Sequence, residues 1–531
     1  FVGDQEPNIA ENGNTGRRTL LYRSAIWPGV VMALGIMIFP ALHGFMPKLM
    51  DERALGDAGP IYALYGLLVL ALRLVCSRLP DALGTGKTAA IALMGSSLGM
   101  VVMGSFVSRS GMFVGAAILA IGIVVTLISR DYVDSNISNP GEYYAILIFT
   151  ILASISLASS GELLTAYVSL EILSFGLYVL VAYDRYNPAS NEGGVKFILL
   201  GAFSSALILY GLSQTYGLIG TTRFNEIAVL LNSMENISIG MVVGFVLILA
   251  GIAFKLAAVP FHMWAPDAYE GAPIPITAWL SVCSKVAIVA LAIRFFTNGI
   301  FPLAPDWQPI LIVLAVLTMI GGNLLALVQK NMKRLLAYSS IGHAGYLLMG
   351  LATLVGVSDE GIVSKELTHL VSNGLIFHMV AYGATNFAIF FCLIIVYNST
   401  GREDIQGLSG LASRQPLVAL VMVCSLFSLA GMPVFAGFTS KFYLFNAVAS
   451  QGFLLLVGVG IIASLISLYY YLTVARYLYI EKISDNSMIY ISFNSKLILI
   501  ALLMFMILGG VYPSPLMDLI QTATDSILKI D

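Results

Sequence analysis

The chain has 531 residues, of which 58% are hydrophobic and only 11% are charged, and its mean hydropathy is +0.89. Soluble proteins carry about 25% charged residues, so this composition excludes an ordinary soluble fold and indicates a polytopic membrane protein. The formal net charge is −2, which leaves no strongly basic surface of the kind that nucleic-acid binding requires.

The first part of the chain combines a polar tail with apolar segments. Residues 1–25 are mostly polar, and residues 26–46 form an apolar segment long enough to cross a bilayer. Further apolar segments follow within residues 60–129. The stretch DALGTGKT at residues 81–88 resembles a phosphate-binding loop, but Asp81 occupies its first glycine position and no buried strand precedes it. We therefore interpret it as an anchor at the membrane interface.

Fifteen apolar segments are long enough to be transmembrane helices, so we expect an all-α polytopic fold. They lie at residues 26–46, 60–77, 88–107, 111–129, 143–160, 162–183, 195–219, 239–262, 272–297, 308–328, 333–356, 369–397, 416–447, 452–479 and 496–512. If the chain changes sides at each helix, seventeen of the 27 Lys and Arg residues fall on one side, seven fall on the other, and three lie in mid-membrane. Because loops on the inner side carry the excess of basic residues, we expect the N-terminus inside and the C-terminus outside.

Two of these helices contain residues that interrupt backbone hydrogen bonding. The interrupting residues are Pro260 in the eighth helix and Gly431, Pro433 and Gly437 in the thirteenth. They fall in the fourth helix of two consecutive five-helix units, residues 143–297 and 308–479, which precede a C-terminal helix and tail at 496–531. Because five is odd, we expect the second unit to be inverted relative to the first, as in many transporters.

Four ionisable side chains lie far inside apolar segments: Glu171, Lys255, Lys285 and Lys441. A charge at the bilayer centre costs about 2.5 to 3.5 kcal/mol, so each needs a partner, water or a role in moving charge. Lys255 is the partner that we expect for Glu171, and an ion pair whose strength changes with the protonation of the lysine would act as a gate. The alternatives are a carboxylate bonded to a neighbouring hydroxyl that fixes helix packing, and lysines that extend to the membrane surface, which is feasible only near helix ends.

Two of the five histidines, His343 and His378, lie within predicted helices. His343 is the candidate for a proton relay because imidazole titrates near neutral pH, whereas His378 is interpreted as a packing residue. A structured loop is expected to contain His262, Trp264, Asp267, Tyr269 and Glu270. The four cysteines lie far apart, without a CxxC pair or a histidine at ligand spacing, so we expect no metal, iron–sulfur or disulfide site in this chain.

Several long sequence motifs, in this order, make the chain resemble the antiporter-like N-type subunit (subunit 2) of respiratory complex I, the proton-pumping NADH:quinone oxidoreductase. They are FKLAAVPFHMWAPDAYEGAPIPITAWLSVCSK, QKNMKRLLAYSSIGHAGY, SLAGMPVFAGFTSKFYLF and SLYYYL, and the resemblance covers about residues 85 to 525. It implies that Glu171 and Lys255 form a pair, that Lys285 is a linking lysine, that His343 is a central histidine, and that Lys441 is a terminal lysine of a proton path. It also implies a subunit of a translocase that performs no redox step itself.

The resemblance implies no cofactor on this chain and places NADH, FMN, iron–sulfur clusters and quinone in partner subunits. The expected partners are other membrane-arm subunits, both antiporter-like and small hydrophobic ones, and lipids, in a mitochondrial inner membrane or a bacterial plasma membrane. The family usually has fourteen helices, so the segment at 26–46 is an additional one. The alternatives are a subunit of a cation/proton antiporter of the same superfamily, against which the YEGAP string weighs, and a non-conducting membrane scaffold.

Overall fold

The computed structural model describes residues 109–234, 238–356, 364–481 and 488–528. Their helices are α5 (Arg109–Asn136), α6 (Pro140–Ser159), α7 (Leu163–Val181), α8 (Pro188–Ile219), α9 (Phe224–Ser233), α10 (Ile239–Lys255), α11 (Trp264–Gly271), α12 (Ile274–Asn298), η1 (Phe301–Leu303), α13 (Ala304–Ala326), α14 (Met332–Ala352), α15 (Lys365–Thr400), η2 (Ile405–Leu408), α16 (Leu411–Arg414), α17 (Pro416–Ala430), α18 (Ala436–Ala449), α19 (Leu454–Tyr479), α20 (Phe493–Val511) and α21 (Ser514–Ile527). The predicted tail at 1–25 and the predicted spans at 26–46, 60–77 and 88–107 lie outside these residues.

The prediction of an all-α membrane fold is confirmed. Within the described ranges, nine helices are long and apolar enough to cross a membrane, and the apolar helices α10 and α17 are shorter. These two shorter helices are the first halves of the spans that were predicted to be interrupted. The predicted interruption of the span at 416–447 is confirmed, because this span is divided between α17 and α18. The predicted extent of the other interrupted span was wrong, because α10 ends at Lys255 rather than at residue 262.

Local sequence signals explain where the long helices begin and end. The Asn187 side chain accepts a hydrogen bond from Ala189 N at 3.0 Å at the start of α8, and Pro188 occupies the first turn. That helix ends at Gly220, whose φ of 83° is the left-handed conformation that glycine adopts without strain. The helix α15 ends in the same way at Gly401, with a φ of 66°.

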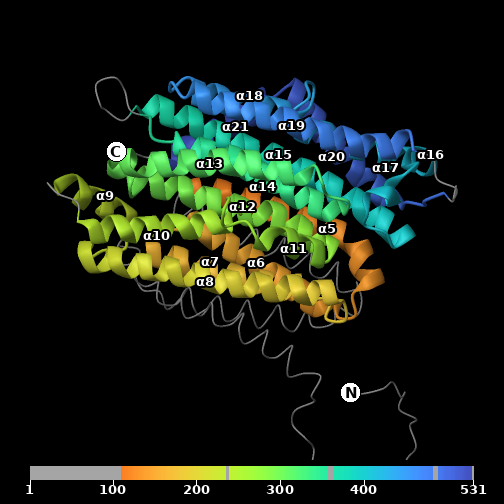
Figure 1. Ribbon diagram of the computed structural model, residues 1–531, viewed down its shortest axis with the longest axis horizontal. Helices are drawn as coiled ribbons and strands as arrows, with labels where there is room; N and C mark the ends of the chain where they lie inside the picture. The colour runs from red at the N-terminus through yellow and green to blue at the C-terminus, as the bar shows by residue number, and fades with distance from the viewer. Residues whose placement is uncertain (1–108, 235–237, 357–363, 482–487, 529–531) are drawn as a thin grey trace, which may run out of the picture. The chain divides into compact units, whose positions relative to one another are not determined.

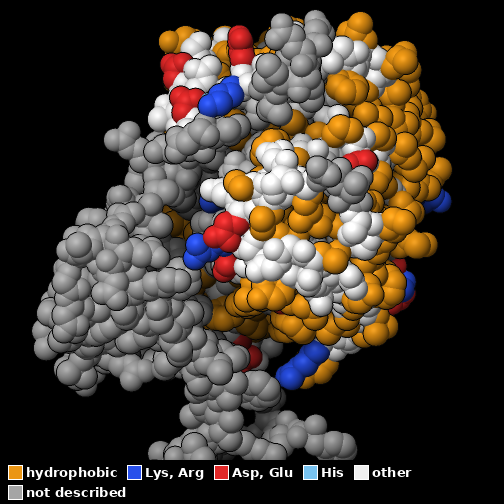
Figure 2. Space-filling model, turned by 90° about the vertical axis from the view of Figure 1, so that its left-hand side faces the viewer, with side chains coloured by type: hydrophobic (Ala, Val, Ile, Leu, Met, Phe, Trp, Pro, Cys, Tyr) orange, Lys and Arg blue, Asp and Glu red, His pale blue; other side chains and the backbone are white. Residues whose placement is uncertain are grey.

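The helices α12, α14 and α15 form the centre of the described part of the chain. They are its most deeply buried candidate spans, and Figure 1 shows them running through the middle of the bundle. The helices α8, α13, α19 and α20 are much less buried, and their exposed side chains are largely apolar, as lipid contact requires. Figure 2 shows hydrophobic side chains over much of one face, with few charged groups among them.

At both interruptions, a side chain bonds to carbonyls at the end of the first half-helix, and backbone groups buried in a membrane need such partners. After α10 the chain passes through Ala257, which has a φ of 58°, and the carbonyl of Phe254 accepts a hydrogen bond from Trp264 Nε1 at 3.0 Å. After α17 the chain turns at Gly431, whose φ is 85°, before α18 begins at Ala436. The carbonyls at the end of α17 bond to a lysine, as described below.

Three helices of eight residues or more were not predicted from apolar length. The segment Trp264–Gly271 was expected to be a loop but forms the helix α11, and its Trp264 ring stacks on Phe197 with centroids 4.3 Å apart. The short helix α9 and the terminal helix α21 were also missed. Each carries polar residues on one side, so a search for long apolar segments does not detect it. The division into two inverted units stays a prediction.

Candidate functional site

Glu171 and Lys255 lie on neighbouring helices but do not form the expected direct ion pair. Ser205 Oγ donates to Glu171 Oε1 at 2.5 Å, and Lys255 Nζ donates to Ser174 Oγ at 2.6 Å. Ser174 lies one helical turn beyond Glu171 on α7. Among the described residues, no carboxylate lies within 4.0 Å of Lys255 Nζ. The hydroxyl-bonded alternative therefore describes the carboxylate in this conformation.

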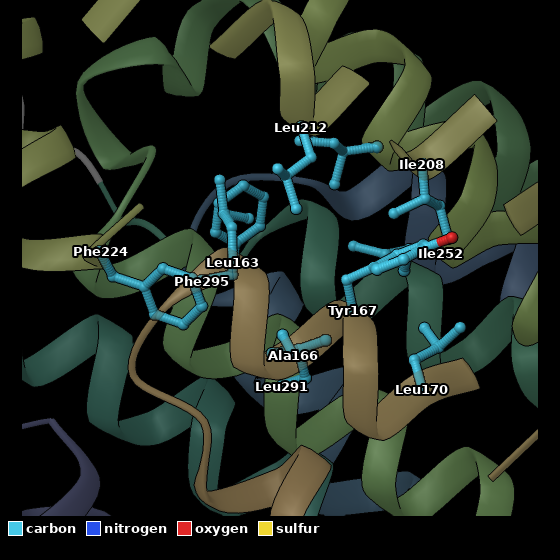
Figure 3. Close-up of a pocket in the computed structure, with 11 residues that line it drawn as sticks. Leu163, Ala166, Tyr167, Leu170, Ile208, Leu212, Phe224, Ile252, Leu291 and Phe295 are labelled. Atoms are coloured by element: carbon cyan, nitrogen blue, oxygen red, sulfur yellow. The ribbon is translucent and has the colours of Figure 1, made fainter. Parts of the chain in front are cut away.

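The surroundings of this pair are apolar. The Lys255 ammonium lies 5.8 Å from the centroid of the Tyr178 ring, within the range of a cation–π contact. A cavity of about 30 Å³ adjoins the same helices, α7 and α10, and Figure 3 shows its lining side chains. These are Leu163, Ala166, Tyr167, Leu170, Ile208, Leu212, Phe224, Ile248, Ile252, Leu291 and Phe295. Walls of this kind provide no ligands for a metal or a nucleotide.

Lys285 is fully enclosed at the centre of the bundle. Its side chain on α12 donates to the backbone oxygen and to the hydroxyl of Ser340 on α14, both at 2.5 Å. The same hydroxyl accepts from Tyr382 on α15 at 2.8 Å and lies 3.1 Å from the Tyr269 hydroxyl on α11. Ser340 thus joins four helices, and a lysine held this deeply cannot reach the membrane surface.

A pair of histidines continues from this serine cluster. His343 Nδ1 lies 3.3 Å from His378 Nε2, and the two rings are stacked with centroids 5.4 Å apart. The centroid of the His343 ring also lies 5.0 Å from that of Tyr382. His378 Nδ1 lies 3.1 Å from Ser440 Oγ on α18. His378 therefore has a partner at each ring nitrogen, which suits a group that takes up a proton at one nitrogen and releases it at the other.

Lys441 lies against the broken end of α17. Its Nζ donates to Leu429 O at 2.8 Å, to Ala430 O at 3.2 Å and to Ser464 Oγ at 2.9 Å. These carbonyls end a helix, where the backbone dipoles favour a positive charge. The ammonium also lies 5.0 Å from the centroid of the Tyr346 ring. The centroid of the Tyr346 ring lies 5.4 Å from that of His343, so Tyr346 connects Lys441 to the histidine pair.

An ionic cluster lies at one end of the bundle, beside the first interruption. Asp267 on α11 accepts from Lys196 at 2.7 Å and from Arg334 at 2.6 Å, and Arg334 also pairs with Glu270 at 2.8 Å. Burial raises the pKa of the Asp267 carboxyl, but the hydrogen bonds from Lys196 and Arg334 outweigh burial and hold that pKa below its ordinary value. The cluster therefore fastens α11 to α8 and α14.

The structure brings together some of the predicted site residues and not others. Lys285, His343 and Lys441 lie along one line of hydrogen bonds and ring contacts, whereas no hydrogen bond among the described residues links Lys255 to Lys285. Sequence reasoning undervalued His378 and did not select Ser340, Tyr382 or Ser440. His378 and Tyr382 are four residues apart in an apolar segment, and this spacing on one helical face was the signal for them.

The comparisons with known proteins agree with this architecture. Residues 160–467 match the family model described as NADH:quinone oxidoreductase/Mrp antiporter, transmembrane. The NADH-quinone oxidoreductase subunit N of Moorella thermoacetica is 40% identical over 432 residues, which cover 81% of this chain and 88% of the relative.

Two solved structures share the fold. A chain of respiratory complex I from Thermus thermophilus with bound aureothin superposes with a TM-score of 0.67 at 24% identity, covering 85% of this chain and 98% of that one. A chain of the Mrp complex from a Dietzia species gives 0.73 at 20% identity, covering 88% and 96%. The chain belongs to the NADH:quinone oxidoreductase/Mrp antiporter transmembrane family, and within it to the relatives of NADH-quinone oxidoreductase subunit N.

Proposed function

We propose that this chain is a proton-translocating membrane-arm subunit of a respiratory NADH:quinone oxidoreductase. The observation that carries the proposal is a buried line of groups from Lys285 through Ser340, His343 and His378 to Lys441, which crosses four helices at the centre of the bundle. The rings of Tyr382 and Tyr346 join the parts of this line that no hydrogen bond links. Buried ionisable groups in membrane helices that contact one another are typical of proton relays.

From Lys285 onwards, the line accounts for proton movement between neighbouring groups. A rearrangement that brings Glu171 to Lys255 would favour the charged lysine, and separation of the two would release the proton towards Lys285. From there it passes along the Ser340 hydroxyl, the histidine pair and water to Lys441, and leaves on the outer side. Moving one charge against 100 mV costs about 2.3 kcal/mol. A change of two in the pKa of a lysine corresponds to about 2.7 kcal/mol, which is sufficient.

The rest of the reaction takes place in other subunits. NADH, FMN, iron–sulfur clusters and quinone belong to partner chains, and electron transfer there changes the electrostatics along the membrane arm. The neighbours in the complex are antiporter-like and small hydrophobic subunits, and the chain spans an energy-coupling membrane with its N-terminus inside and its C-terminus outside. The ionic cluster supports this assignment of connections to the two sides of the membrane. Its residues Lys196, Asp267 and Arg334 lie together, and all three were assigned to the same side.

The experiment that tests the proposal replaces one charge in the intact, assembled complex. With Lys255→Ala, NADH oxidation in proteoliposomes should move fewer protons per electron, because this subunit no longer loads protons. The matched control is Lys330→Ala, which makes the same change at an exposed lysine and should keep the full ratio. If the Lys255→Ala complex moves as many protons per electron as the unsubstituted complex, the proposal is contradicted.

A cation/proton antiporter subunit is the second candidate, because the Mrp chain has the same fold. The two functions differ in the transported ion. The purified assembly should acidify the vesicle interior at the same rate with and without sodium if it pumps protons. Sodium-driven proton exchange in the absence of NADH and quinone would favour the antiporter.

A further inference from the structure

Helices α15 and α21 pack against one another in antiparallel register at the end of the bundle opposite to the ionic cluster. His369 Nδ1 lies 3.2 Å from Asp525 Oδ1 at one end of their contact. Eight residues further along α15, Phe377 forms an apolar cluster with Met517 and Ile520 of α21. Figure 1 shows the two helices close together, in agreement with their contacts. We call this contact the α15/α21 seam.

Two buried polar side chains of the seam have no hydrogen-bond partner among the described residues. Asn373 lies four residues from both His369 and Phe377, so it is on the same face of α15. Thr524 follows Ile520 by four residues on the matching face of α21. Asn373 Oδ1 and Thr524 Oγ1 have no hydrogen-bond partner among the described residues, although Asn373 is 9% exposed and Thr524 is 0% exposed. The neighbouring Ser372 Oγ is likewise buried and unpartnered.

Buried polar groups in folded proteins bond to protein or to ordered water. We infer that three such groups beside the contact between His369 and Asp525 form a niche that holds water. The niche lies at the surface of the described part of the chain, because the side chain of Asp525 is 71% exposed and that of His369 is 30% exposed. It is a polar entrance set into an otherwise apolar helix contact.

An apolar cluster separates this niche from the histidine line. Phe377 immediately precedes His378, and its ring packs edge to face on Tyr443 of α18 with centroids 5.6 Å apart. Met517 and Ile520 complete the cluster and are 8% and 2% exposed. A constriction lined by such side chains excludes water when closed and conducts when it becomes wet.

We propose that the α15/α21 seam is the proton outlet of this subunit, with Phe377, Met517 and Ile520 as its gate and Asn373, Thr524 and the His369–Asp525 pair as its hydrated mouth. The proposal rests on the proposed function. Water carries the proton: when the gate becomes wet, a proton that has reached Lys441 crosses the niche and enters the outer solution between His369 and Asp525.

The first test measures hydration without reference to pumping. A small charged thiol reagent is added to membranes that contain the assembled complex with Thr524→Cys or, one turn away, Ile520→Cys. A cysteine in apolar surroundings carries less reactive thiolate, so Thr524→Cys should react on the order of tenfold faster. The unsubstituted complex corrects for the native cysteines, and Asn373→Cys is a second reporter if Thr524→Cys does not assemble. Equal reaction at both positions, or none at either, overturns the proposal.

The second test separates the outlet from the proposed function. Asn373→Leu with Thr524→Val should lower the protons moved per electron to the value obtained with Lys441→Met. If Lys441→Met lowers the ratio and the double variant does not, the outlet lies elsewhere and the proposed function stands. If neither change lowers the ratio, the proposed function fails as well.

Discussion

The three lysines that were predicted to lie in mid-membrane are stabilised by oxygens that carry no full charge, unlike the buried Lys333, which pairs with Glu403 at 2.9 Å. Lys255 donates to a hydroxyl, Lys285 to a carbonyl and a hydroxyl, and Lys441 to two carbonyls and a hydroxyl. A buried carboxylate in contact would fix a lysine in its charged form, because separating such a pair in a low dielectric is costly. Hydroxyl and carbonyl oxygens, in contrast, accept a hydrogen bond from either the ammonium or the neutral amine of the lysine. The lysines are therefore suited to gain and lose a proton.

His378 gives the first prediction at the scale of one residue. His378→Gln keeps a polar group of similar size near His343 but cannot relay a proton between two ring nitrogens. We expect fewer protons per electron in the intact complex, with unchanged assembly. The control is Cys392→Ala, a small change at a buried position of the same helix. If both variants move the same number of protons per electron, His378 is not part of the proton path.

Gly431 gives a second prediction because its conformation and its space are both constrained. Its φ is 85°, and a Cβ there would lie 3.1 Å from Lys441 Cδ, whereas a Cβ at Gly452, which has the same φ, meets nothing within 4 Å. Alanine at either position should cost about 1 to 2 kcal/mol for the left-handed backbone. Only Gly431→Ala should also lower the protons moved per electron, by displacing Lys441. Thermal unfolding and proton-to-electron measurements on both variants check this, and equal pumping would show that the crowding has no effect.

At the scale of elements, the two broken helices use their interruptions differently. In the first, Lys255 is the last residue of the half-helix α10, whereas in the second Lys441 lies in the half-helix after the break and reaches back to the carbonyls of α17. Proline and glycine in apolar segments predicted both breaks. They did not predict which carbonyls the lysines contact, because that depends on how the two halves pack.

The ionic cluster gives a prediction about how α11 is held in place. Asp267→Asn removes a charge that accepts two hydrogen bonds, so the free energy of unfolding should fall by about 1 to 3 kcal/mol. Because the pKa of Asp267 is held down in the fold, its contribution is complete above about pH 4 and is lost as the pH falls through the folded pKa. The stability difference between the two proteins should therefore shrink in acid.

The control for this prediction is Glu192→Gln. Glu192 pairs with Lys196 at 2.6 Å, but its side chain is 65% exposed, so its removal should cost at most about 1 kcal/mol. Thermal unfolding of both variants in the same detergent makes the comparison. A loss for Glu192→Gln as large as that for Asp267→Asn would contradict a specific role for the Asp267 contacts.

At the scale of the whole molecule, apolar length predicted most of the described spans to within a few residues. The segments at 272–297 and 452–479, for example, became Ile274–Asn298 and Leu454–Tyr479. Amphipathic helices such as α21 were missed because their apolar residues lie on one face only.

The site was only partly predictable. A lysine or glutamate is conspicuous in an apolar segment because its burial is costly. Serine and tyrosine are common in such segments, so Ser340 and Tyr382 stood out only once the packing of α12, α14 and α15 was known. Packing also decided that Glu171 bonds to Ser205 rather than to Lys255, since a hydroxyl on α8 lies closer.

The central claim is that the buried line conducts protons, and Lys285→Met in the intact complex tests it most directly. Methionine keeps the length of the side chain while it removes the charge and the hydrogen bonds to Ser340. The protons moved per electron during NADH oxidation in sealed vesicles should fall, whatever the rate of electron transfer. An unchanged proton-to-electron ratio in this variant would contradict the account.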